Sequence, residues 1–422
     1  MRFKLLTVFF MVSSLGFSQA TLSTLNEIAD FAINNSLDSR RSQVSLDKAE
    51  NDVVSYIKVD STKVSTTGNY NQDGDITFNT SLNIPIVEQL SISGGVDGEL
   101  NGSVSLNIDP IVHSNSVPLS VNNYDTALLN NVKILSSVEQ NAVKAALDWM
   151  LGSRALELLD KQTQRYKTLY EDDKNRYSNG SITLDELQES LINWSNARKS
   201  LLEQKQSFYT LESNLYAQLG TTKESVIIEK LDLDDMIESL NQLYRLVESG
   251  SGDYLKDIDY QSAVLTSDKA KLTYNAIWVY DPDITGSIKL DLTDQGVSMD
   301  NFAASLNFSL SLDNVNYTEK KRAQEEYLIS VKDRELKLDK ARLDFEQCKD
   351  LVESSKIESE IFKFEYAQAE ILLSEAVILY NAGEYSEIEL LESKLFLEQA
   401  ENNLLNSYKN EYLNLLDYLK YF

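Results

Sequence analysis

The sequence has very few of the residues from which catalytic and metal sites are usually built. Cys348 is the single cysteine and His113 the single histidine among 422 residues. His113 follows a strand-like segment and Cys348 lies in a helical run, so the pattern indicates neither a catalytic dyad nor a histidine-based metal site. One cysteine also excludes an intramolecular disulfide. We therefore expect no enzymatic activity, no cofactor and no bound metal.

Positive charge and long apolar runs are scarce as well. The 39 Lys and Arg residues face 66 Asp and Glu residues, which gives a formal net charge of −27. Such acidity disfavours nucleic acid and anionic lipid headgroups as partners. After residue 20, no apolar run reaches the roughly 18 residues that a membrane-spanning helix needs. The sequence therefore predicts no helical membrane span after this point.

The first 20 residues form the one apolar segment with a clear targeting pattern. Arg2 and Lys4 precede an apolar run from Leu5 to Leu15, and Ser18-Gln19-Ala20 fits the small-x-small rule for signal peptidase. We interpret residues 1–20 as an export signal. Its removal would take away two positive charges and change the formal charge from −27 to −29.

The rest of the chain contains an internal duplication. At an offset of about 203 residues, Tyr177 aligns with Tyr380 and Gly180 with Gly383, and the similarity continues for about forty positions. We predict a first structural repeat over residues 21–220, a connector over 221–253 and a second repeat over 254–422. Each repeat is expected to contain a helix, a β segment (62–110 or 274–313), a long helix, a Tyr-x-x-Gly turn (177–183 or 380–386) and a returning helix.

The β segments and the turns have distinct local signals. Ser103-Val104-Ser105-Leu106-Asn107-Ile108-Asp109 alternates between polar and apolar residues, and Ser305 to Leu312 does the same in the second repeat. In each Tyr-x-x-Gly turn, glycine supplies the backbone freedom that reversal of a helix requires. A residue from Ser181 to Thr183 is placed to cap the first returning helix, and Ser386 the second.

These motifs together resemble the TolC-like outer membrane efflux and secretion channels. The specific stretches are Arg-Tyr-Ser-Asn-Gly-Ser-Ile-Thr-Leu-Asp-Glu-Leu from Arg176 and Leu-Tyr-Asn-Ala-Gly-Glu-Tyr-Ser-Glu-Ile-Glu-Leu-Leu-Glu-Ser from Leu379. The resemblance implies a mainly α fold with membrane β-strands. It implies a homotrimer with a periplasmic α-barrel, in which each copy gives four strands to a shared twelve-stranded β-barrel. It also implies an outer membrane location with a long periplasmic extension.

The implied function is a passive exit duct of a tripartite efflux or type I secretion system. Its partners would be outer membrane lipid and a periplasmic adaptor, which connects it to an inner-membrane pump. The alternative is an exported periplasmic helical-hairpin adaptor or structural protein. An adaptor should carry one hairpin between lipoyl-like β domains, whereas this chain carries the hairpin twice with strands of membrane type. This difference favours the duct.

Three features depart from the family pattern. Residues 62–110 have room for about four strands where the family uses two, which indicates a second hairpin or an extended loop. Pro110 follows the first β segment, but no proline follows Leu312. Phe422 resembles a barrel assembly signal, but it lies in helical sequence, which disfavours that role.

The resemblance places the functional residues at the two turns. Glu389 and Glu392 correspond to carboxylates that line the periplasmic constriction, and the alternative is an ordinary solvated acidic face. Where the best-known family member has a charged latch, this chain has Tyr385, whose hydroxyl we expect to bond to Glu186. Tyr380 is a second latch candidate, whereas Tyr177 is expected to pack. The residues expected to dock the adaptor are Tyr177, Asn179, Gly180, Ser181, Gly383 and Glu384.

Overall fold

The computed structural model describes residues 20–57, 63–70, 76–87, 90–96, 102–108, 116–230, 232–277, 280–293 and 296–422. The export signal expected at residues 1–20 lies outside this range except for Ala20, and so do His113 and Pro110. Within the described residues, no helix is both long enough and apolar enough to cross a membrane.

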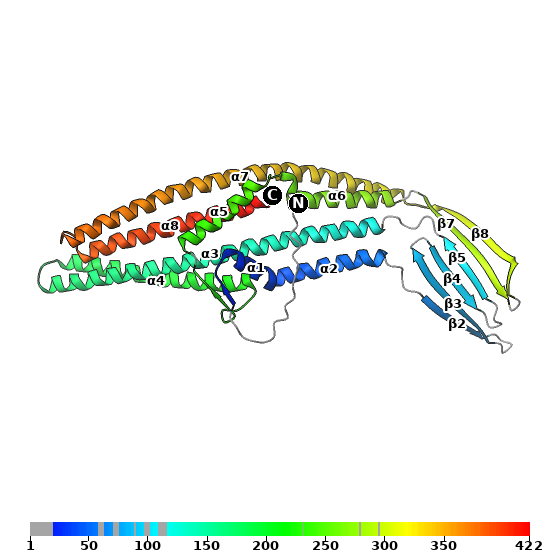
Figure 1. Cartoon of the computed structure of the whole chain (residues 1–422), viewed down its shortest axis with the longest axis horizontal. Helices are drawn as coiled ribbons and strands as arrows, with labels where there is room; N and C mark the ends of the chain where they lie inside the picture. Colours follow the sequence, from blue (N-terminus) through cyan, green and yellow to red (C-terminus); the bar gives the residue numbers. More distant parts are fainter. Residues whose placement is uncertain are drawn as a thin grey trace. The chain divides into compact units, whose positions relative to one another are not determined.

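Helices make up most of the described chain (Figure 1). They are α1 (Leu25–Asn35), α2 (Leu37–Ile57), α3 (Ser116–Ser178), α4 (Leu184–Leu219), α5 (Leu233–Ser249), α6 (Ile258–Ala276), α7 (Tyr317–Asn381) and α8 (Glu387–Leu419), with a short 3-10 helix at Tyr254–Lys256. The strands are β1 (Ala20–Leu22), β2 (Lys63–Tyr70), β3 (Ile76–Val87), β4 (Leu90–Val96), β5 (Gly102–Ile108), β6 (Val226–Ile228), β7 (Tyr280–Thr293) and β8 (Gly296–Val315). The prediction of a mainly helical chain is confirmed.

The single helix expected before the first β segment is in fact two helices. Ser36 separates α1 from α2 with φ −59° and ψ 137°, which is not helical. Its backbone N–H still donates to the Ala32 carbonyl, while its hydroxyl accepts from the Asp38 backbone N–H at 3.2 Å. Serine competes in this way with the helical hydrogen bonds, so a periodic apolar pattern alone does not reveal the break.

Six strands form one antiparallel sheet in the order β2-β3-β4-β5-β7-β8. The two halves of the sequence meet where β5 pairs with β7, with Leu106 opposite Ile288. The sheet has two strands more than the four that the family resemblance implies, because residues 62–110 form two hairpins. Pro85 and Pro282 both lie at shifts in the strand register, where a missing backbone N–H is tolerated. β1 and β6 form a separate two-stranded parallel sheet.

The contacts divide the chain into two compact units, and each unit draws on both halves of the sequence. The first contains the residues up to Arg40, Ile134–Asp253 and Asp344–Phe422; the second contains Arg41–Lys133 and Tyr254–Leu343. The six-stranded sheet belongs to the second unit. The hydrophobic core described next and both hairpin turns belong to the first.

The core of the first unit lies where five helices and the two short strands β1 and β6 converge. Ile28 of α1, Val143 of α3, Leu215 of α4 and Leu404 of α8 are almost completely buried there. Small residues at Ala142, Ala145 and Ala146 let neighbouring helices approach α3 closely. α5 closes the core along one side, and its Tyr244 hydroxyl donates at 2.5 Å to the buried carboxylate of Glu411 on α8.

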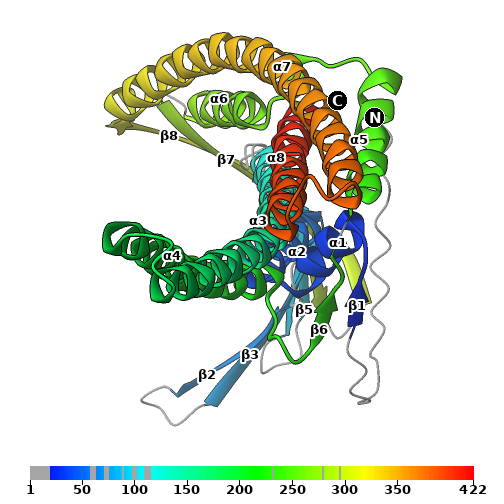
Figure 2. The same cartoon turned by 90° about the vertical axis from the view of Figure 1, so that its left-hand side faces the viewer.

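Side-chain contacts order the four long helices of this unit as α4, α3, α8 and α7 (Figure 2). Gly152 of α3 lies against Leu211 of α4, where a Cβ would come within 2.6 Å of the leucine. Phe345 of α7 contacts Tyr418 of α8 and Tyr421, which follows the end of α8, with ring centroids 5.6 and 5.1 Å apart. Helices α3 and α8 therefore lie between the two outer helices, α4 and α7.

Candidate functional site

Each of the two long hairpins reverses in a turn of the same geometry. At the first turn, the Gly180 N–H donates to the Tyr177 carbonyl at 2.9 Å and the Ser181 N–H to the Arg176 carbonyl at 2.8 Å. Gly180 has φ +73°, so these bonds form the Schellman arrangement that ends many helices at glycine. The tyrosine of the Tyr-x-x-Gly motif thus contributes its backbone carbonyl to the turn.

The second turn repeats this arrangement. Gly383, with φ +80°, donates to the Tyr380 carbonyl at 3.0 Å, and Glu384 donates to the Leu379 carbonyl at 2.9 Å. No heavy atom lies within 4 Å of the position that a Cβ would occupy at either glycine. Glycine is therefore needed here for its backbone conformation and not for lack of space.

The returning helices begin with capping boxes, which engage two of the candidate gating carboxylates. Thr183 caps α4 and Ser386 caps α8, as the sequence indicates. Glu186 accepts from the Thr183 N–H at 2.7 Å and hydroxyl at 2.9 Å, and Glu389 accepts from Ser386 in the same way at 2.7 and 2.8 Å. These backbone hydrogen bonds, followed by the hydroxyl bonds, lower the pKa of both Glu186 and Glu389.

The sequence around these two glutamates contains a helix-capping pattern, which predicts a local role different from the constriction that the family resemblance implies. Thr183-Leu184-Asp185-Glu186 and Ser386-Glu387-Ile388-Glu389 both match the Ser/Thr-x-x-Glu pattern of a capping box. Local helix capping explains both carboxylates without reference to a channel. The assignment of Glu186 and Glu389 to a constriction remains a prediction.

Glu392 forms a contact between the two hairpins. Its carboxylate pairs with the guanidinium of Arg165 on α3, whose side chain is 17% exposed. Tyr166 lies next to this pair, with its ring centroid 5.5 Å from the guanidinium carbon. The contact links α3 to α8 near both turns, which makes Glu392 the gating candidate that directly joins the hairpins.

The three candidate tyrosines are partly exposed and are not joined by their hydroxyl groups. Tyr177, Tyr380 and Tyr385 are 42%, 39% and 37% exposed. Among the hydrogen bonds of the described residues, the expected bond from Tyr385 to Glu186 is not formed within one chain; Glu186 accepts from Thr183 instead. The remaining predicted docking residues, Asn179, Gly180, Ser181, Gly383 and Glu384, are all exposed.

A cleft of about 290 Å³ opens between α3 and α4 near the first turn. Glu186 and Glu189 line it from α4, and Asp173 and Arg176 line it from α3, where these last two form an ion pair at 3.1 Å. Leu169 and Ile182 supply apolar walls. This cleft gives the first hairpin a charged surface just behind its exposed turn.

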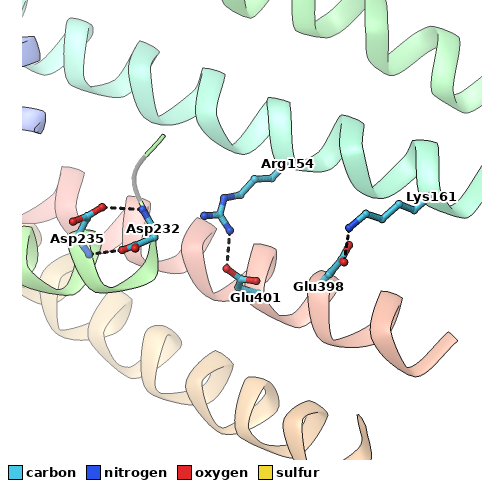
Figure 3. Close-up of polar contacts among 6 residues, drawn as sticks. All are labelled: Arg154, Lys161, Asp232, Asp235, Glu398 and Glu401. Carbon is cyan, nitrogen blue, oxygen red and sulfur yellow. Dashed lines mark hydrogen bonds and ion pairs between the residues drawn. The ribbon is translucent and has the colours of Figure 1, made fainter. Parts of the chain in front are cut away.

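A series of ion pairs holds α3 against α8 behind the turns (Figure 3). Arg154 pairs with Glu401 at 2.7 Å and Lys161 with Glu398 at 2.5 Å. Lys409 and Asp148, with side chains 16% and 26% exposed, continue the series at 2.9 Å. Residue numbers rise along α3 as they fall along α8, so the helices run antiparallel.

Figure 3 also shows the capping box of Asp232 and Asp235, with which α5 begins.

The described residues contain no group of three or more His, Cys, Asp or Glu side chains placed to hold a metal ion. Cys348 is buried between α7 and α8 and lies 3.4 Å from the Asp417 carboxylate. Burial and the neighbouring Asp417 carboxylate raise the pKa of its thiol to about 11, so the thiolate that reacts with electrophiles is disfavoured.

Comparison with known proteins gives matches at the level of structure. No protein-family model and no curated protein sequence matches the chain. The outer membrane protein VceC from Vibrio cholerae is 15% identical with a TM-score of 0.62, covering 94% of this chain and 96% of its own. The MtrE outer membrane channel from Neisseria gonorrhoeae, solved in an open state, is 13% identical with a TM-score of 0.59, covering 97% and 93%. CusC, described with transmembrane channel formation, is 13% identical with a TM-score of 0.61, covering 97% and 94%.

Proposed function

Because the chain has the fold of these outer membrane channels over nearly its whole length, we propose that it is the outer membrane duct of an efflux or secretion system. The observation that carries the proposal is the shared fold of the whole chain, with two helical hairpins and one antiparallel sheet. The solved neighbours are outer membrane proteins and channels. We therefore place this chain in the outer membrane, with its hairpins extending into the periplasm.

The duct requires several copies of the chain. Both edges of the six-stranded sheet, β2 and β8, have no neighbouring strand in the single chain among the described residues. An unpaired strand edge in lipid leaves backbone N–H and C=O groups without hydrogen bonds, which costs several kcal/mol per group. We propose that three copies join their sheets edge to edge, so that β2 of each copy pairs with β8 of the next.

We propose that the two turns form the periplasmic entrance, where an adaptor docks and the duct opens. The turns are exposed, and Thr183 and Ser386 fix the direction of the returning helices through their capping boxes. The Arg165–Glu392 pair would hold the two hairpins together in the closed state, and opening would separate it. In this proposal Glu392 takes the latching role that the family resemblance assigns to Tyr385.

The experiment that tests the duct is purification of the full chain from outer membranes in detergent. We expect a particle of three copies with three-fold symmetry in single-particle images, and ion conductance after reconstitution into planar bilayers. Recovery in the soluble periplasmic fraction, or a monomer in every detergent tried, would instead favour the exported hairpin adaptor or structural protein.

A further inference from the structure

The hairpin formed by β4 and β5 is the feature by which the sheet exceeds the four strands that the family resemblance implies. It is paired on both sides, because β4 pairs with β3 and β5 pairs with β7. At the outer end of the sheet, away from the helices that precede β2 and β7, Gly102 lies opposite Leu292. β7 ends one residue later, at Thr293. The hairpin therefore reaches the level where β7 ends and is part of the sheet, not a loop beyond it.

A short repeat in the sequence supports the same conclusion. β3 contains Ser81-Leu82-Asn83-Ile84, and β5 contains Ser105-Leu106-Asn107-Ile108. Pro-Ile-Val follows the first segment directly and the second segment after Asp109. A repeated sequence indicates a repeated structural unit. We therefore interpret β4–β5 as a second copy of the β2–β3 hairpin, made for the same surroundings.

The register gives the four inner strands one apolar face and one polar face. One row of opposed residues consists of Ile84, Ile92, Leu106 and Ile288. The neighbouring row consists of Asn83, Ser93, Ser105 and Lys289. Successive residues of a strand belong to opposite faces, so the two rows lie on different faces. An apolar face for lipid and a polar face for a water-filled interior are typical of membrane strands, and β4 and β5 share this pattern with β3 and β7.

We propose that three copies close a ring of eighteen strands, in which the β4–β5 hairpin of each copy widens the outer end of the duct. This proposal rests on the proposed duct function and specifies the width of its membrane part. Each of the six strands is antiparallel to its neighbours, so the two edge strands, β2 and β8, also run in opposite directions. β8 of one copy and β2 of the next therefore meet as an antiparallel pair, like every pair within the chain.

The number of strands sets the width of such a ring. Strands lie about 4.8 Å apart and tilt by about 40° in membrane sheets. Twelve strands then give a backbone diameter of about 24 Å, and eighteen strands give about 36 Å. Rings of about 16 to 18 strands leave an open aqueous channel. The outer end of this duct would therefore pass cargo that a ring of twelve strands excludes.

The helices that join the sheet are compatible with this width. Within the second unit, α2, α3, α6 and α7 lie side by side in this order. The contacts are Ser42 with Asn131 at 3.0 Å, Asn122 with the Leu265 carbonyl at 2.9 Å, and Tyr274 with Tyr327 at 6.3 Å between ring centroids. Three copies would bring twelve such helices into a ring, whose circumference is about 100–120 Å at 8–10 Å per helix. Eighteen strands span about 110 Å and twelve span about 75 Å, so the larger ring can follow the helices without narrowing.

Disulfide formation within one chain tests whether β5 lies beside β7. In a Cys348→Ser background, Ser105→Cys and Lys289→Cys replace residues that are directly opposite in the sheet. We expect this pair to form a disulfide on oxidation of the full-length protein in outer membranes, as detected by peptide mass spectrometry. The absence of this disulfide would overturn the proposal.

The matched control combines Ser81→Cys with Lys289→Cys. Ser81 has the place of Ser105 in the repeated segment, but β4 and β5 separate its strand from β7, so no disulfide should form. If β4–β5 lay outside the ring, β3 would take the place of β5 beside β7. A disulfide from the control pair alone would therefore overturn the proposal.

Excision of the hairpin tests the width. Val87 and Ile108 both lie at the level of Leu90, so removal of residues 88–108 leaves four strands and a chain that can close. In planar bilayers, neutral polymers added from the outer side should enter only up to a limiting radius, which the excision should lower by about 6 Å. The limit from the side of the hairpin turns should stay the same, because the turns are untouched. An unchanged outer limit would overturn the proposal.

Single-particle images of the parent protein separate this proposal from the duct itself, and they do not depend on whether the excised variant assembles. Eighteen strands in a particle of three copies would support both. A particle of three copies with twelve strands, and with β4–β5 outside the ring, would overturn this proposal and leave the duct intact. A parent protein that is a monomer in every detergent tried would overturn both.

Discussion

Substitution of the turn glycines provides the sharpest test of how the hairpins reverse. Gly383 has φ +80°, and no heavy atom lies within 4 Å of the position that a Cβ would occupy. The cost of a side chain there should therefore be conformational: about 1 kcal/mol for Gly383→Ala and up to about 3 kcal/mol for Gly383→Val. Asparagine tolerates this backbone region better than alanine does, so Gly383→Asn should cost less although its side chain is larger.

Gly220 offers a matched comparison, because it has a similar backbone conformation in a crowded place. Its φ is +66°, but a Cβ there would come within 2.7 Å of the Asn35 carbonyl oxygen and 2.9 Å of the carbonyl carbon. Gly220→Ala should therefore incur both the conformational cost and a backbone clash, and destabilise more than Gly383→Ala. Gly220→Asn should be no better tolerated than Gly220→Ala, which reverses the order expected at Gly383.

Native-state hydrogen exchange measures these costs locally. The Glu384 N–H is bonded to the Leu379 carbonyl at 2.9 Å and reports opening of the second turn. A cost of about 1 kcal/mol should speed its exchange about fivefold in Gly383→Ala. Faster exchange in Gly383→Asn than in Gly383→Ala, or a Gly220→Ala variant as stable to heat as the parent, would refute this reasoning. Adaptor docking should weaken in Gly383→Val while the oligomer persists.

Four further predictions concern two tyrosines of the core and the acidic residues near the turns. Tyr244→Phe should destabilise the protein by about 1–3 kcal/mol in thermal unfolding, because Glu411, only 4% exposed, loses its hydroxyl partner. Burial raises the pKa of Tyr412 to about 12. The stability that its neutral hydroxyl contributes should therefore be complete below about pH 10 and decline between pH 10 and 12 in alkaline unfolding. A Tyr412→Phe variant with the same decline would contradict this. Replacing both Glu389 and Glu392 by Gln should weaken the cation preference of the duct in planar bilayers, and should also weaken its blockage by multivalent cations, without preventing assembly. Unchanged ion selectivity would place the constriction elsewhere. Because hydrogen bonds from Ser386 lower the pKa of Glu389, block through this residue should persist to more acidic pH than an unperturbed glutamate would allow.

The sequence determined those features that depend on residues close together in the chain. Each hairpin turn is closed by hydrogen bonds that span only a few residues, so Tyr-x-x-Gly and the following Thr183 or Ser386 were sufficient to locate it. The length of residues 62–110 likewise indicated more strands than the family uses, and four are formed there. The capping roles of Glu186 and Glu389 were also readable from Ser/Thr-x-x-Glu, although the family resemblance directed attention to a constriction.

Only the tertiary structure decided which distant residues meet. Arg165 and Glu392 are 227 residues apart in sequence, and with 66 acidic residues available the sequence offers no means of choosing this pair. The order α4, α3, α8, α7 likewise depends on the contact of α3 with α8, which joins the two repeats and leaves α4 and α7 as the outer helices. Local hydrogen bonds are specified by neighbouring residues, whereas ion pairs between distant residues depend on how helices from both halves of the chain pack together.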